Sequence, residues 1–436
     1  MLVAIIVFVI AYALIIWDKF DRTLVALGGA VAVVLFGAVP ATEIFGLIDL
    51  HTIILLVSMM IIVEICAQTG IFQYLAIKMI RFSKGSPTML LVFLSLFTAV
   101  ASACLDNVTT ILIMLPIVIT ICKDLKINPI PFVIALTFAS NIGGTATGIG
   151  DPPNLMIMVQ SKLSFLSFIE NLTPIILVIL PITILIFTQI FKKDFNAMKI
   201  DFSYINQLDE KTAIKDKPLL KKSLIVLSFT FLGFLFSQPL AELIQRIPGF
   251  SGVRYDSTTV AMTGAVVLLA ISGLHIERII KKVEWKTIFF FVGLFMLVGS
   301  LNYTGVLQLL GDFVVTTFGS NGLLLAIVIL WVSAIASAFV DNIPFTATMI
   351  PIILAIGNNP ASNMDIVPLW WALALGACLG GSGTIIGASA NVIAAGVLEE
   401  HGHKISFRYF FRKSFPTMLL TIVISTIYLV IRYYLL

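Results

Sequence analysis

The stretch "SACLDNVTTILIMLPI", Ser102 to Ile117, places an aspartate and an asparagine inside a run that is otherwise as apolar as a membrane span. A second stretch, "SAFVDNIPFTATMIPI", Ser337 to Ile352, repeats the pattern, and Asp341 occupies the position equivalent to Asp106. A charge at the centre of a bilayer costs about 2.5 to 3.5 kcal/mol on insertion scales. Because better packing by an aspartate would not offset that free-energy cost, the two aspartates predict a function inside the membrane.

The composition of the chain supports a membrane environment. The 436 residues are 59% hydrophobic and only 11% charged, with a mean hydropathy of +1.08, which excludes a water-soluble globule. Helices satisfy their own backbone hydrogen bonds in lipid, so we expect an all-α polytopic membrane protein. We also expect that the protein is not an enzyme. The four cysteines lie in apolar surroundings without metal or disulfide spacing, and we interpret them as core residues.

Runs of about 20 apolar residues predict the membrane spans. The first run has no basic leader or cleavage site, so we interpret it as a retained span. Two further runs are too long for one helix and contain the Asp-Asn pairs, and we expect each to form a re-entrant hairpin. The ten predicted spans are 1–17, 23–39, 51–69, 130–160, 172–191, 222–239, 257–274, 286–304, 367–398 and 415–434. The two predicted hairpins are 88–121 and 322–357.

Basic residues in the loops predict the orientation. Eight lysines lie between Phe191 and Ser223, and we therefore place the loop 192–221 in the cytoplasm. The basic segments 18–22, 275–286 and 399–413 then fall on the same side, and both termini lie outside. Topology explains these basic loops without a nucleic-acid partner.

An internal repeat runs through the chain. At an offset of 235 residues, "HTIILLVSMMIIVEICAQTGIFQ" from His51 lies over "KTIFFFVGLFMLVGSLNYTGVLQ" from Lys286, and at 237 "GGTATGIGDPPN" lies over "GGSGTIIGASAN". We therefore expect a first repeat, a cytoplasmic linker and a second repeat over 1–191, 192–221 and 222–436. Each repeat has five crossings, an odd number, so the second is inverted.

Inverted repeats of this kind place a substrate site near the bilayer midplane. The glycine-rich blocks must break the spans 130–160 and 367–398, because glycine and proline disfavour helix interiors, and the exposed backbone can then face a polar solute. Asp151 has no acidic counterpart, since Ala388 stands there. The candidate binding residues are Asp106, Asn107, Thr109, Asp341, Asn342, Gly143, Gly144, Thr145, Thr147, Asp151, Asn154, Gly380, Gly381, Ser382, Thr384 and Asn391.

Two structural alternatives remain open for these residues. The glycines could serve close helix packing, and each hairpin aspartate could cap the helix that follows it. A cap and an ion ligand can coexist in one residue.

The blocks "ASACLDNVTTILIMLP" and "SNIGGTATGIGDPPNLMI" resemble the ArsB/NhaD group of the ion transporter superfamily, which includes arsenite permeases, sodium/proton antiporters and the melanosomal P protein and is related to citrate and dicarboxylate transporters. The likeness covers nearly the whole chain. It implies paired re-entrant hairpins, two broken helices, an elevator-like motion, a homodimer and a prokaryotic plasma-membrane location.

The two acidic tips predict the substrate class. No Arg or Lys lies in the motifs, which argues against a dianion. A cation or a neutral hydroxylated solute remains, driven by a proton or sodium gradient without a cofactor. The resemblance favours proton-coupled arsenite or antimonite efflux, and the alternative is sodium/proton exchange with sodium at the Asp106 and Asp341 tips. Cys104 and Cys378 lie beside the motifs, but we do not assign them as ligands.

Other classes fit less well. "GIGD", residues 148–151, matches an intramembrane aspartyl protease pattern, yet the one Tyr-Asp pair, Tyr255-Asp256, lies in a predicted outside loop. A passive channel would share the hairpins. Uphill flux driven by a pH gradient would exclude it.

Overall fold

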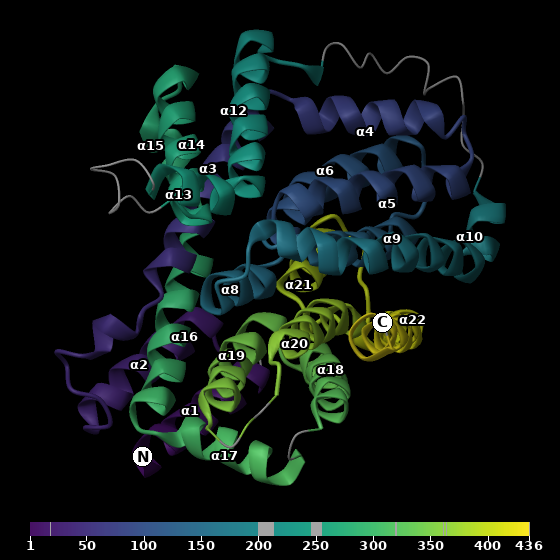
Figure 1. Ribbon diagram of the computed structural model, residues 1–436. Helices are drawn as coiled ribbons and strands as arrows, with labels where there is room; N and C mark the ends of the chain where they lie inside the picture. The colour runs from purple at the N-terminus through teal and green to yellow at the C-terminus, as the bar shows by residue number, and fades with distance from the viewer. Residues whose placement is uncertain are drawn as a thin grey trace.

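The computed structural model describes residues 1–17, 19–198, 213–245, 255–318, 321–360, 362 and 364–435 (Figure 1). Every regular element in these ranges is a helix, which confirms the all-α class. Eight helices are at least 18 residues long and apolar enough to cross a membrane, and further apolar helices are shorter. The protein is therefore an integral membrane protein with many crossings.

The helices of the first repeat follow the predicted spans, and the predicted span 130–160 is broken in two. They are α1 (Leu2–Trp17), α2 (Arg22–Leu35), α3 (Leu50–Gln68), α4 (Ile71–Phe82), α5 (Pro87–Cys104), α6 (Asn107–Asp124), α7 (Ile130–Thr145), α8 (Pro152–Ser161) and α9 (Phe165–Ile190). A short 3₁₀ helix, η1 (Ile44–Leu47), precedes α3. Of the predicted linker 192–221, the segment 199–212 lies outside the described residues, whereas α10 (Lys192–Ala197) and the start of α12 are helical.

The second repeat also matches its predicted spans, and the span 367–398 is broken as expected. Its helices are α12 (Lys217–Leu235), α13 (Ser237–Gln245), α14 (Ser257–Ser272), α15 (Ile276–Ile280), α16 (Trp285–Tyr303), α17 (Val306–Phe318), α18 (Gly322–Phe339), α19 (Asn342–Asn358), α20 (Val367–Gly380), α21 (Ser389–Glu400) and α22 (Phe407–Val430).

Equivalent helices of the two repeats begin at a nearly constant offset. The helices α2, α3 and α5 begin 235 residues before α14, α16 and α18 (257−22, 285−50 and 322−87). The turns agree as well, since Gly70 and Gly305 have left-handed φ angles of 85° and 76° before α4 and α17. Glycine adopts that conformation without strain. The repeat seen in the sequence is therefore a repeat of structure.

Each predicted hairpin is a pair of helices joined by a two-residue turn. The helices α5 and α6 each contain 18 residues, so each is about 27 Å long at 1.5 Å per residue. That length approaches the bilayer thickness. A hairpin returns to the side from which it came whether it is re-entrant or crosses fully, so each repeat still changes sides an odd number of times and the second repeat is inverted.

The helices form two groups joined by two arms (Figure 1). The scaffold group contains α1, α2, α3, α12, α14 and α16, and the hairpin group contains α5 to α9 and α18 to α22. The helix α4 leads from the scaffold group to the first hairpin, and α17 leads to the second. Figure 1 shows these two arms at opposite ends of the molecule.

Two glycines allow the hairpins to pack closely on the broken helices. A Cβ atom at Gly143 would lie 2.1 Å from the carbonyl oxygen of Ala99 on α5, and one at Gly380 would lie 2.5 Å from that of Ala334 on α18. Real Cβ atoms do not approach so closely. The close-packing interpretation is therefore confirmed at Gly143 and Gly380, which lack room for any side chain.

We expect Gly143→Ala to lower the thermal unfolding midpoint of the detergent-solubilised protein by several degrees, because overpacking costs about 1 to 3 kcal/mol. Gly28→Ala is the matched control, since Gly28 also lies in a helix and a Cβ there would meet no atom within 4 Å. The midpoint of the control should stay or rise. Equal midpoints for the two variants would contradict the close packing.

Candidate functional site

An asparagine side chain stabilises each break in the two broken helices. The Asn154 Nδ2 donates to the carbonyl oxygens of Thr145 at 3.0 Å and Thr147 at 2.9 Å. The Asn391 Nδ2 donates to the carbonyls of Gly381 at 2.9 Å and Thr384 at 2.8 Å, and Thr384 is the repeat counterpart of Thr147. These carbonyls have lost their helical partners, and lipid offers none. The amides therefore make the irregular backbone tolerable at membrane depth.

Two threonines attach the breaks to the hairpins. The Thr147 Oγ1 donates to the carbonyl of Ala103 at 2.7 Å, and the Thr384 Oγ1 donates to that of Ala338 at 2.5 Å. Each hydroxyl thus binds the last turn of α5 or α18, next to the hairpin tip. The remaining predicted residues of the breaks lie in the same place and are all buried, namely Gly144, Thr145, Gly381 and Ser382.

The hairpin aspartates cap the helices that follow them. One Asp106 oxygen accepts the backbone N–H of Thr109 at 2.7 Å and the other accepts its hydroxyl at 2.5 Å. The Asp341 Oδ1 accepts the N–H of Ile343 at 3.1 Å. The capping alternative is therefore confirmed at both hairpin tips.

The tip of the second hairpin contacts the break of the first repeat. The Asn342 Nδ2 donates to both oxygens of Asp151, at 3.2 and 3.4 Å, and Asp151 is fully buried. Asp106 and Asp341 both lie near enough to interact electrostatically with Asp151. Three carboxylates that are distant in the sequence, one of them without a counterpart, thus share one buried region.

A polar network joins the repeats at their centre. The Asn107 Nδ2 donates to Asn141 Oδ1 at 3.1 Å, and the Asn141 Nδ2 lies 3.1 Å from Ser382 Oγ and 3.3 Å from Asn391 Oδ1. On the opposite side of the pseudo-symmetry, the Cys378 thiol lies 3.4 Å from Asn154 Oδ1. The Asn107 Oδ1 is buried and accepts no hydrogen bond from the described residues.

Sequence reasoning missed several residues of this region. Asn141 and Cys378 occupy equivalent positions at the 237-residue offset, so the alignment of the two blocks could have assigned both to the site, whereas Cys378 is only noted as lying beside the motifs. The sequence indicates Arg22 only as part of the basic segment 18–22, which predicts the membrane orientation. In the structure its Nη1 lies 3.0 Å from Asp341 Oδ2. The Ser389 hydroxyl donates to the same oxygen at 2.6 Å. No pattern in the sequence connects Arg22 with Asp341.

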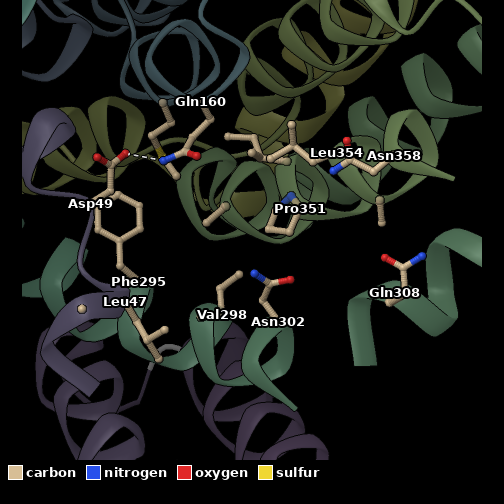
Figure 2. A pocket seen from close by; sticks show the side chains of 16 residues that line it. Leu47, Asp49, Gln160, Phe295, Val298, Asn302, Gln308, Pro351, Leu354 and Asn358 are labelled. Carbon is tan, nitrogen blue, oxygen red and sulfur yellow. Dashed lines mark hydrogen bonds between the residues drawn. The ribbon is translucent and has the colours of Figure 1, made fainter. Parts of the chain in front are cut away.

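Two cavities lie between the scaffold and hairpin groups, at opposite ends of α16. A cavity of about 460 Å³ at the start of α16 contains Asp341, Arg22 and Lys286. A cavity of about 370 Å³ lies beside the second half of α16. Figure 2 shows the amides of Asn302, Gln308 and Asn358 around this second cavity. The candidate site therefore has solvent-sized space on both sides of it along α16.

Each cavity has an acidic residue at the cap of a scaffold helix nearby. Asp49, before α3, accepts from Gln160 at 2.7 Å in the second cavity (Figure 2). Its repeat counterpart Glu284 precedes α16 and lies outside that span. Burial, together with the nearby Asp106 carboxylate, raises the pKa of Glu284 to about 7.

The described residues contain no group of three or more His, Cys, Asp or Glu side chains arranged for a metal ion. A sodium site at the tips would thus need backbone, amide or solvent oxygens as well, and it stays a prediction. The two aspartates of the protease alternative, Asp151 and Asp256, have different partners. Asp151 accepts from Asn342, whereas Asp256 accepts from the Thr259 N–H at the start of α14 and its Oδ2 lies 3.8 Å from His51 Nδ1.

These features define the class of the protein. Two inverted repeats with paired hairpins, two broken helices and cavities on both sides of a buried polar site are typical of a secondary transporter. The comparisons with known proteins agree with that class. Residues 12–376 match the CitMHS family, described as citrate transporter. The chain belongs to this family, within the ion transporter superfamily that the sequence resemblance indicated.

Several named relatives cover the whole chain. A "46 kDa membrane protein" of Mycobacterium leprae is 40% identical over 99% of this chain and 98% of its own length, and an uncharacterized transporter of Mycobacterium tuberculosis is 40% identical over 100% and 99%. The human P protein is 34% identical over 97% of this chain, which spans 59% of that protein. The fold matches the Alcanivorax borkumensis YdaH transporter, described as having an unusual topology, with a TM-score of 0.54 over 96% and 97% of the chains at 12% identity.

We expect Asn154→Ala and Asn391→Ala to destabilise the protein to a similar extent, because each leaves two buried carbonyls unpaired at about 1 to 3 kcal/mol apiece. The control is Asn302→Ala, since Asn302 is exposed. Thermal unfolding in detergent would measure the difference. A loss in only one of the two variants would contradict the equivalence of the breaks.

Proposed function

We propose that this chain is a secondary active transporter that exchanges protons for a small inorganic cation, with sodium as the first candidate. The observation that carries the proposal is the shared burial of Asp106, Asp151 and Asp341, which are 8%, 0% and 2% exposed. All three lie where the two repeats meet. Asp341 lines the cavity at the start of α16, and alternating access would require a movement that opens the three carboxylates to each cavity in turn.

The charge balance of this region requires a mobile cation. Arg22 compensates one carboxylate, Asp341, by direct contact. A buried carboxylate without a counter-charge is costly, so the other two must hold protons or another cation. Proton and cation then compete for the same oxygens. Competition at a site with alternating access is sufficient for exchange, and it makes proton coupling a property of the site itself.

The ligand chemistry favours a hard monovalent cation. Carboxylate oxygens, together with the unpartnered Asn107 Oδ1, are oxygen donors of the type that hard cations prefer. The same cluster of negative groups opposes citrate or another organic anion. The family description alone therefore does not make citrate the substrate of this chain.

Arsenite or antimonite efflux is the second candidate, and Cys378 is the observation that favours it. Its thiol lies buried beside Asn154 in the central network. Neutral As(OH)₃ could donate hydrogen bonds to the carboxylates while a proton moves in the opposite direction. Tight thiolate binding would slow release, which is why we place this candidate second.

The sidedness of transport follows from the predicted orientation. With the basic loops in the cytoplasm, the cavity at Lys286 faces the cytoplasm and the cavity at Asn302 faces the outside. We propose an elevator-like movement of the hairpin group against the scaffold group, in a homodimer held by the scaffold. Protons would enter from outside while the cation leaves.

We expect Asp106→Asn, Asp151→Asn and Asp341→Asn each to reduce exchange about tenfold to a hundredfold, since a charge-assisted contact contributes about 1.5 to 3 kcal/mol. The measurement is uphill flux in proteoliposomes driven by an imposed pH gradient, with sodium, lithium and arsenite compared in parallel.

The control for this experiment is Glu277→Gln, which removes an exposed carboxylate of α15. Its flux should equal that of the wild type. Normal rates in all three aspartate variants would refute the assigned site. Flux that never runs uphill would indicate a passive channel, and flux of arsenite alone would favour the second candidate.

A further inference from the structure

Arg22 forms a link between the two groups of helices. It is the first residue of α2, which packs on α1 and α16 in the scaffold group. Its guanidinium Nη1 lies 3.0 Å from Asp341 Oδ2, at the tip of the second hairpin. The two residues are 319 positions apart in the sequence and form an ion pair. A movement of one group against the other must therefore break this ion pair.

The position of Arg22 is not explained by the stability of its own helix. A cation at a helix N-terminus opposes the helix dipole. The Asp21 side chain already caps α2 by accepting from Thr23 and Leu24. Arg22 thus adds nothing to the start of the helix, whereas it makes a direct charged contact with Asp341.

The other cation at this end of α2 already has a carboxylate partner. Lys286 Nζ lies 2.6 Å from Asp21 Oδ2, and its hydrogen bond lowers the pKa of Asp21, which keeps that carboxylate charged. Lys286 is thus bound at the mouth of the cavity. Among these residues it is Arg22 that reaches the buried tip.

Arg22 occupies the place that a transported cation would need. Asp341 Oδ2 accepts from both Arg22 and Ser389, while Oδ1 accepts from the backbone of Ile343. Arg22 is 18% exposed to the cavity of about 460 Å³, so it has room to move away. Arg22 and Asp341 both line this cavity, so an ion that enters it reaches the ion pair directly.

The first hairpin has no equivalent arrangement. The residue at the position equivalent to Arg22 is Ser257, an uncharged residue, and the next Lys or Arg after it is Arg278 on α15. Asp106 instead accepts from Thr109 of its own helix. The two repeats are therefore equivalent in backbone but different in charge, and among the described residues the scaffold group supplies a counter-ion to the second tip.

We propose that Arg22 is a built-in competitor of the transported cation, which neutralises Asp341 while the site is empty and leaves it when the cation binds. The proposal rests on the proposed function. Arg22 acts here as a specificity-determining residue: it sets the concentration at which the cation loads, and its release frees the second hairpin from α2. A proton or a cation at Asp341 is thus coupled to the freedom of the hairpin group to move.

The test compares three variants by sodium-dependent flux in proteoliposomes at a fixed alkaline pH, where protons compete least. Arg22→Gln should lower the half-saturating sodium concentration roughly tenfold, because a charge-assisted hydrogen bond no longer competes for Asp341. Arg22→Lys keeps the charge on a side chain with fewer donors, and we expect a smaller decrease, about twofold to threefold. The matched control is Lys19→Gln, since Lys19 lines the same cavity and lies 5.2 Å from the Trp17 ring. It should keep the wild-type value.

A purely structural Arg22 would lower the maximal rate or the yield without changing half-saturation. An unchanged or higher half-saturating concentration in Arg22→Gln, with wild-type sodium flux intact, would overturn this proposal alone. If Arg22→Gln does not fold, the same criterion applies to Arg22→Lys. A decrease of equal size in Lys19→Gln would also overturn it, because general charge in the cavity would then be the cause. Wild-type protein without cation flux would instead overturn the proposed function, and this inference with it.

Discussion

The need to satisfy backbone hydrogen bonds inside the bilayer governs the rest of the structure. Each broken helix exposes carbonyls that lipid cannot pair, and Asn154 and Asn391 each pair two of them through one amide. Once the breaks are stable, they form rigid surfaces against which the hairpin tips pack. The buried carboxylates depend on that packing, because Asp151 is held by Asn342 of the opposite repeat. The polar site is thus a consequence of how the breaks are closed.

The two repeats share the residues that build the fold and differ at some of the polar positions near the centre. Positions that build the frame agree between them, such as the threonines that bind each hairpin and the glycines at φ near +80°. Positions that face the centre differ: Asp151 has the counterpart Ala388, and Asn141 has Cys378. Symmetry in the frame allows both sides to open in turn. Asymmetry at the centre leaves three buried carboxylates, Asp106, Asp151 and Asp341, where exact symmetry would give two or four.

The sequence predicted the frame well because its signals are local. Apolar runs, Gly and Pro blocks and the two Asp-Asn pairs each act within one segment, and all appear as helices, breaks and capped tips where expected. The contacts of the site are long-range and follow from packing. Nothing in "DKFDR" indicates that Arg22 lies at Asp341, and nothing near Glu284 indicates Asp106. The internal repeat was the one source of long-range information, and it could have identified Asn141 and Cys378.

The asymmetry of charge has a mechanistic consequence for a transporter built from equivalent halves. If both tips had the same partners, the site would bind its ion equally from either side. Here Asp341 has a guanidinium from the scaffold group, whereas Asp106 is capped from within its own hairpin. A movement that separates the groups therefore changes the electrostatics of one tip much more than the other. Affinity then differs between the two open states, which favours release on one side.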